Sequence, residues 1–103
     1  MTTELLGNTT FKPTDDVTWR DVSGEMVVLK LSSGEYYTFN EQGRITWLAL
    51  SEGKSMEQAV GMIVNEYDVS SDKAREDMEV FVVGLMEQEL LDRQTEAGKE
   101  VRE

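Results

Sequence analysis

The chain has 103 residues, of which 39% are hydrophobic, and its formal net charge is −11. This length and composition suit one soluble globular domain with a modest core. The absence of cysteine and histidine excludes disulfides, thiol nucleophiles, histidine acid–base catalysis and the usual zinc sites. The longest apolar runs, such as 26–29, are too short to cross a membrane, and no secretion signal opens the chain, so we expect a cytoplasmic protein.

The ends of the chain differ from its middle. Residues 1–14 lack hydrophobic periodicity and contain the only proline, which predicts a flexible N-terminal arm, and residues 93–103 predict a charged C-terminal tail. The domain is expected over residues 15–92, which hold 17 acidic and 6 basic residues and therefore the whole charge imbalance. Such a domain should repel nucleic acid and anionic membranes and favour cationic partners.

Three strands are predicted first, over residues 17–22, 26–31 and 36–39, with turns at 23–24 and 32–34. They form an antiparallel meander. Alternation along the second and third strands assigns one set of side chains to the core face: Val27, Leu29, Leu31, Tyr37 and Phe39.

Three helices are predicted next. Asn40 caps a short helix that runs to about Leu50 and is ended by Gly53, and Ser55 and Gln58 have capping-box spacing before an apolar stripe over 56–67. Ser70 or Ser71 caps the last helix, whose inner face is Ala74, Met78, Phe81 and Leu85. The predicted fold class is α+β: a three-stranded antiparallel sheet followed by a three-helix bundle, similar to a winged helix-turn-helix.

No pattern in the sequence indicates catalysis or a metal site. The acidic clusters at 15–16 and 76–79 lack EF-hand spacing, and a solvated acidic face is their simpler interpretation. Neither a glycine-rich phosphate loop nor a nucleophile elbow is present. We therefore expect a protein that is not an enzyme and uses no cofactor.

Two binding functions follow from the predicted fold. A winged-helix DNA-binding regulator would insert the last helix into a groove, but that helix carries six acids against Lys73 and Arg75. The alternative is peptide binding at the third strand, an edge that lacks lysine and proline and to which an extended peptide can add. Tyr36, Tyr37 and Phe39 are then either contact residues or simply core and cover.

The stretch SGEYYTFNEQGRITWLAL resembles the PqqD-like family, the recognition elements for precursors of ribosomally made, modified peptides. The matching positions there are Gly34, Tyr37, Phe39, Asn40, Gly43, Ile45 and Trp47. The second half matches at Ala59, Tyr67, Val69, Ala74, Asp77, Phe81, Leu85, Leu90 and Leu91. Glu89 departs from the pattern, because glycine is common at that position, and leaves the end of the last helix in doubt.

The resemblance implies that a precursor's leader peptide lies along the third strand, residues Glu35, Tyr36, Tyr37, Thr38 and Phe39, in a groove against the last helix. It implies no catalysis; the partners are the leader and a modifying enzyme, such as a leader peptidase or a radical-SAM or cyclase-type enzyme. The sequence is most similar to stand-alone members of lasso-peptide pathways.

One shoulder of the last helix is predicted to form the wall of this groove. Asp77, Val80 and Gly84 follow one another at helical spacing beside Phe81. A valine and a glycine are unusual on a solvated shoulder, since glycine costs a helix about 1 kcal/mol relative to alanine. The alternative is that Gly84 lets another helix pack closely and that Asp77 bonds within the fold.

Overall fold

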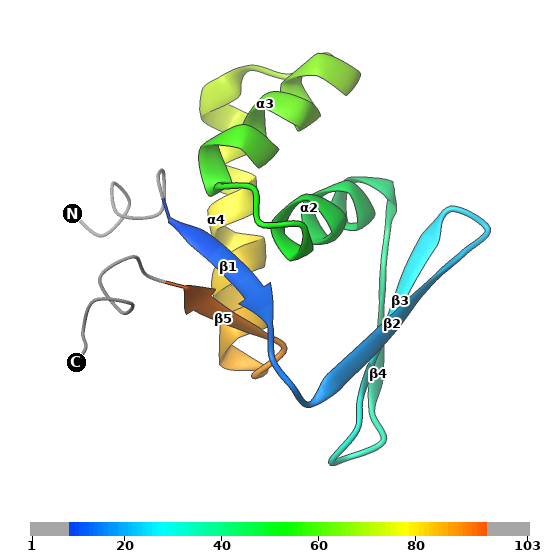
Figure 1. Cartoon of the computed structure of the whole chain (residues 1–103). Coiled ribbons are helices and arrows are strands. Elements are labelled where there is room, and N and C mark those ends of the chain that lie inside the picture. Colours follow the sequence, from blue (N-terminus) through cyan, green and yellow to red (C-terminus); the bar gives the residue numbers. More distant parts are fainter. Residues whose placement is uncertain (1–8, 95–103) are drawn as a thin grey trace, which may run out of the picture.

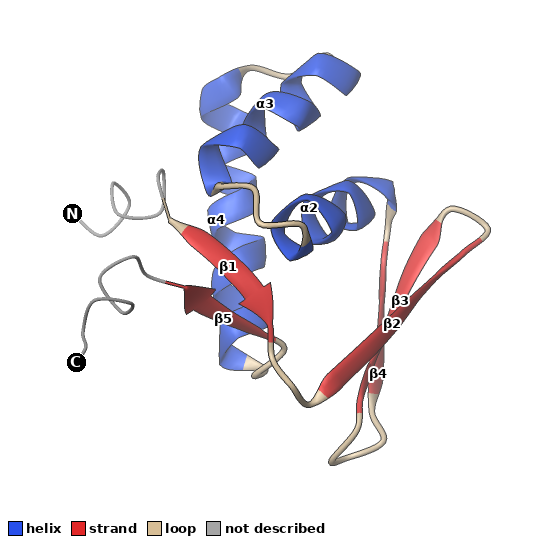
Figure 2. Cartoon of the chain, viewed as in Figure 1, coloured by secondary structure: helices blue, strands red, loops and turns tan. Residues whose placement is uncertain are grey.

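The structure is a computed structural model of the chain and describes residues 9–94. Strands β2 (Val17–Val22), β3 (Glu25–Lys30) and β4 (Tyr36–Phe39) form an antiparallel sheet in the order β2-β3-β4. Helices α2 (Glu41–Ser51), α3 (Met56–Glu66) and α4 (Ser71–Glu87) follow. Figure 2 shows this succession of strands and helices, which confirms the predicted α+β fold.

The predicted helix caps are present. The Asn40 side chain accepts a hydrogen bond from the Gly43 N–H at 2.9 Å, and Ser55 forms a complete capping box with Gln58. Of the two candidate serines before α4, Ser70 is the cap and accepts from the Lys73 N–H. These side chains satisfy backbone donors that the first turn of a helix leaves free, so each helix begins where its cap dictates.

The sheet projects to one side of the helices, and α2 follows β4 directly and joins the two parts (Figure 1). The apolar core lies mainly among the helices and is centred on side chains that are completely buried, including Trp47, Leu50 and Leu90. Trp19 from β2 covers Trp47 edge-to-face, with ring centroids 5.4 Å apart. An aromatic contact with the middle of α2 therefore connects the sheet to the core.

The structure differs from the prediction at both ends of the domain. Strand β1 (Thr10–Pro13) pairs antiparallel with β5 (Leu91–Gln94), and the two lie side by side in Figure 1. The predicted arm therefore supplies a strand, and its Phe11 side chain is fully buried in the core. This strand pair holds the two ends of the domain together beside α4. The rest of the predicted arm and tail, residues 1–8 and 95–103, lies outside the described residues.

The core face predicted for the second strand was wrong, whereas that of the third was right. Met26 and Val28 are fully buried, and pairing places Val28 beside Tyr37 and Met26 beside Phe39. Tyr37 and Phe39 pack against the core as predicted. The side chains assigned to the core by mistake are Val27, Leu29 and Leu31. Val27 and Leu29 point to the other face of the sheet because successive strand residues alternate, and Leu31 lies beyond the end of β3 and is exposed.

A valine-to-alanine substitution should lower the free energy of unfolding by different amounts on the two faces of β3. Val28→Ala should lower the free energy of unfolding by about 2 kcal/mol, because it removes two buried methyl groups and leaves a cavity. Val27→Ala is a matched control of the same residue type on the same strand, and we expect less than about half that loss. Urea unfolding measures both. Equal costs, or a larger cost at Val27, would contradict this strand register.

Candidate functional site

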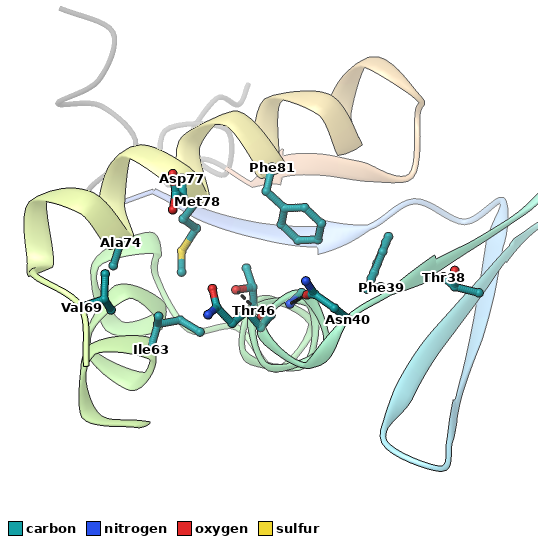
Figure 3. A pocket seen from close by; sticks show the side chains of 12 residues that line it. Thr38, Phe39, Asn40, Thr46, Ile63, Val69, Ala74, Asp77, Met78 and Phe81 are labelled. Carbon is teal, nitrogen blue, oxygen red and sulfur yellow. Dashed lines mark hydrogen bonds between the residues drawn. The ribbon is translucent and has the colours of Figure 1, made fainter. Parts of the chain in front are cut away.

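A cavity of about 330 Å³ opens between β4, the first turns of α2 and the N-terminal half of α4 (Figure 3). Apolar lining side chains come from α3, the loop after it, α4 and Phe39 of β4, and polar ones come from β4, α2 and the segment between them, together with Asp77 of α4. The lining residues are Thr38, Phe39, Asn40, Gln42, Gly43, Thr46, Ile63, Val69, Ala74, Asp77, Met78 and Phe81. An apolar pocket with a few polar groups at its mouth is the usual form of a binding site.

Gly43 allows β4 and α2 to meet at the edge of this cavity. A Cβ atom at this position would lie 2.8 Å from the Cβ of Phe39 and 3.3 Å from the ring of Phe81. The first distance is shorter than real Cβ contacts, so any other residue here would force the strand away from the helix. The glycine in the first turn of α2 is thus explained by the close approach of Phe39.

Two aromatic contacts hold Phe39 in place. Its ring lies 5.1 Å from that of Phe81 on α4 in an edge-to-face arrangement, and 5.8 Å from that of the buried Trp47. Aromatic pairs at these separations stabilise a structure by about 0.5–1.5 kcal/mol beyond the area they bury. The Phe39–Phe81 pair therefore connects β4 to α4 across the space between them.

The outer edge of β4 has unpaired backbone groups. The Lys30 N–H donates to the Glu35 carbonyl at 2.8 Å, which identifies this pair as hydrogen-bonded across β3 and β4. Because such pairs alternate along an antiparallel ladder, Tyr37 and Phe39 also bond to β3, whereas the N–H and C=O groups of Tyr36 and Thr38 point away from it. β4 is an edge strand of its sheet, so among residues 9–94 these four groups have no strand partner.

A polar cluster links the sheet to the C-terminal end of α4. The Lys30 ammonium donates to the Gln88 carbonyl at 3.0 Å and lies 3.4 Å from the Glu89 carboxylate. The Tyr37 hydroxyl lies 3.3 Å from the Gln88 side chain. Glu89 has a left-handed backbone with φ of 64°, a conformation that glycine usually supplies after a helix. α4 therefore ends at Glu87 with Gln88 as its C-cap, and Glu89 takes the left-handed place where the family pattern has glycine.

Charge near the cavity is mostly compensated on its α4 side. Asp77 at the mouth pairs with Lys73 one turn earlier at 3.2 Å. Near the first turn of α2, burial raises the pKa of the Tyr67 hydroxyl, and the nearby Glu41 carboxylate raises it further. This group therefore carries no charge at neutral pH. Within residues 9–94 no cluster of acidic side chains is arranged to hold a metal ion, and no helix is long and apolar enough to span a membrane.

The structure brings together some of the predicted site residues and separates others. Thr38, Phe39, Asp77 and Phe81 line the cavity, and Tyr37 lies at the polar end of the same groove. Glu35 and Tyr36 lie at the same polar end, at the start of β4: the Glu35 carboxylate accepts a hydrogen bond from the Tyr37 hydroxyl at 3.3 Å, whereas the Tyr36 side chain is 69% exposed on the outer face of the sheet.

Val80 and Gly84 do not line the cavity. The Val80 side chain is 72% exposed, and apart from the local backbone of α4 and the two neighbouring residues no described atom lies within 4 Å of a Cβ built on Gly84. Close helix packing therefore does not explain this glycine. Asp77 bonds within α4, as the alternative interpretation expected, and also lies at the cavity mouth.

Sequence reasoning missed the part of the cavity that α2, α3 and the following loop contribute. Asn40 and Gly43 carried local signals, as a helix cap and as a glycine inside a helix, but neither indicated a binding role. Thr46, Ile63 and Val69 belong to apolar or neutral stripes that look like ordinary core positions. Only the packing of α2, α3 and α4 against one another brings these residues to one cavity.

Fold and groove define a small α+β domain of winged-helix type, in which a free sheet edge runs beside the last helix. The chain belongs to the PqqD family: the family described as "Coenzyme PQQ synthesis protein D (PqqD)" matches residues 25–91. A search of curated proteins gave no match.

Two solved structures share the fold. "TbiB1 in Complex with the TbiA(beta) Leader Peptide" is 34% identical, with a TM-score of 0.74 over 78% of this chain and 93% of that one. "Lasso peptide synthetase B1 complexed with the leader peptide" is 25% identical, with a TM-score of 0.74 over 79% of this chain and 95% of that one.

The role of Gly43 can be tested by two glycine substitutions in helices. Gly43→Ala should lower the free energy of unfolding by about 1–3 kcal/mol, because the new methyl group collides with the strand. Gly61→Ala on α3 has no atom within 4 Å of its new Cβ and should instead raise stability by up to about 1 kcal/mol. Urea unfolding distinguishes the two. A neutral or stabilising Gly43→Ala would show that Phe39 does not need this close approach.

Proposed function

We propose that this protein binds the leader of a ribosomally made precursor peptide as an added strand at β4 and presents it to a modifying enzyme or leader peptidase. It contributes no catalytic step of its own. The observation that carries the proposal is the free edge of β4 beside α4, in a fold shared with two proteins whose structures contain leader peptides. One of these proteins is a lasso peptide synthetase B1, which favours a lasso-peptide pathway.

Backbone pairing supplies the first part of the binding interaction. The N–H and C=O groups of Tyr36 and Thr38 are oriented to bond with an incoming strand, as hydrogen-bond alternation requires. Glu35 and Phe39 flank this pairing segment. Strand addition of this kind depends little on the peptide's side chains, so a further feature has to select the leader.

Side-chain pockets supply that selection. Leader residues beside Tyr37 and Phe39 share their face of the sheet and therefore point toward α4, into the groove and its cavity. Phe81 contacts such residues directly, and Asp77 accepts a hydrogen bond from a donor at the mouth. Val80 and Gly84 extend the wall past the cavity, where an exposed valine and an open glycine leave room for an apolar leader side chain.

The charge of the domain favours basic partners. Of the bases in the described residues, Lys30, Arg44, Lys54, Lys73 and Arg75 already pair with the protein's own acids. The excess of carboxylates therefore faces solvent, and a basic leader or a basic docking surface on the enzyme would associate faster with it. A second role in DNA binding is disfavoured for the same reason, because both bases of α4 are neutralised within the protein.

Calorimetric titration tests the proposed function. The probes are the TbiA(beta) leader peptide and the leader of a precursor encoded beside this protein's gene. We expect at least one to bind with a dissociation constant below about 100 μM, which corresponds to about −5.5 kcal/mol. No binding of either peptide would contradict the proposal, and salt-sensitive retention of duplex DNA would favour the winged-helix alternative.

Two variants of one residue show whether binding uses the strand edge. Thr38→Pro removes an N–H that points to the free edge, a position at which sheets tolerate proline, so the fold should survive. We expect leader affinity to fall at least about tenfold, or 1.4 kcal/mol. Thr38→Ala keeps that N–H and should bind within about threefold of the wild type. Equal binding by both variants would place the leader elsewhere.

A further inference from the structure

We propose that the Phe81 ring fixes the register of the bound leader by fitting between two of its groove-facing side chains. This inference rests on the proposed function and deepens it: it names the residue that decides which part of the leader is read. It applies to a leader bound as an extended strand along β4.

Strand pairing by itself leaves the register undefined. A peptide that slides by two residues along an edge keeps the same hydrogen-bond pattern and the same side chains on the groove face. β4 is only four residues long, so few side-chain pairs along it oppose such a slip. A recognition protein that presents a defined segment to an enzyme therefore needs a feature that blocks movement in steps of two.

Phe81 lies where such a feature has to be. The groove has two parts: the cavity beside Phe39 and Asp77, and the polar end beside Tyr37 and Gln88. Phe81 follows Asp77 by four residues and precedes Gln88 by seven along α4, and its ring reaches from the helix toward Phe39 of β4 (Figure 3). Leader residues beside Phe39 and Tyr37 would lie on either side of it.

The spacing of an extended strand matches this arrangement. Two side chains on the same face of a strand are separated by about 7 Å along it. That distance leaves room for one aromatic ring between them. A slip by two residues would bring a different pair of side chains to the ring, so a leader is held only where the pair on both sides fits.

The surroundings of the Phe81 ring also keep it in the position that opposes a two-residue slip of the leader. Phe39 contacts it edge-to-face at 5.1 Å. On the α2 side, a Cβ on Gly43 would lie 3.3 Å from its tip, so the glycine leaves the space that the ring occupies. The Phe39 ring on one side and the α2 backbone near Gly43 on the other limit the movement of the Phe81 ring, which opposes its displacement by a sliding side chain.

Disulfide capture measures the register directly, because the chain has no cysteine of its own. Thr38→Cys provides one thiol at the edge strand, and single cysteines are placed at successive positions of the leader that binds in the titration. With Phe81 present we expect one leader position to be captured most, by at least about fivefold over the positions two residues away. With Phe81→Ala added, capture should spread over positions two residues apart, with comparable yields.

Further variants keep this test decisive. Phe81→Leu retains an apolar side chain in the core but lacks the far half of the ring, so it should fold even if the alanine variant does not, and it should show the same spread. Val83→Ala removes a valine that lies about 200° around α4 from Phe81 and should leave one dominant position. A single dominant position in both Phe81 variants would overturn the proposal. Absence of capture and of binding in the wild type would instead contradict leader binding itself.

Discussion

The contact between Phe39 and Gly43 is the constraint on which the groove depends. β4 ends at Phe39, Asn40 caps α2, and the strand can turn into the helix only because position 43 has no side chain to meet Phe39. This junction sets the angle at which the sheet leaves the helices. It also places the free edge of β4 beside α4, with the Phe39 and Phe81 rings in contact across the gap.

The groove separates two tasks that a peptide-binding site has to perform. In the proposed binding mode, the backbone groups of Tyr36 and Thr38 pair with almost any extended peptide, which would contribute affinity without sequence selectivity. The cavity and the Phe81 ring would then contribute the selection of sequence and register. Lys30 and Tyr37 close the far end by bonding to Gln88, so the distance between sheet and helix is held at both ends of the groove.

Local signals in the sequence predicted the elements well. The caps at Asn40 and Ser55 are short-range chemistry, and the structure contains both. The face of β3 could not be predicted, because Met26, Val27, Val28 and Leu29 are all apolar and alternation is then uninformative. Pairing with β4 decides the face, since Val28 lies beside the inward Tyr37.

Long-range packing explains the remaining differences. β1 and β5 are short and contain proline or charged residues, and each is stabilised by the other across the length of the chain. The sequence predicted the strand and helix that border the groove, because Phe39 and Phe81 belong to regular patterns. It could not reveal that Ile63 and Val69 complete the cavity, since their places depend on how α3 packs beside α4.

Amide hydrogen exchange along β4, measured by NMR with and without the leader, tests the central claim most directly. In the free protein the Tyr37 and Phe39 amides should exchange slowly, because they bond to β3, and the Tyr36 and Thr38 amides should exchange fast. A saturating leader should slow Tyr36 and Thr38 at least about tenfold, the effect expected for about 1.4 kcal/mol of added protection. If a bound leader left both amides as fast as before, strand addition at β4 would be contradicted.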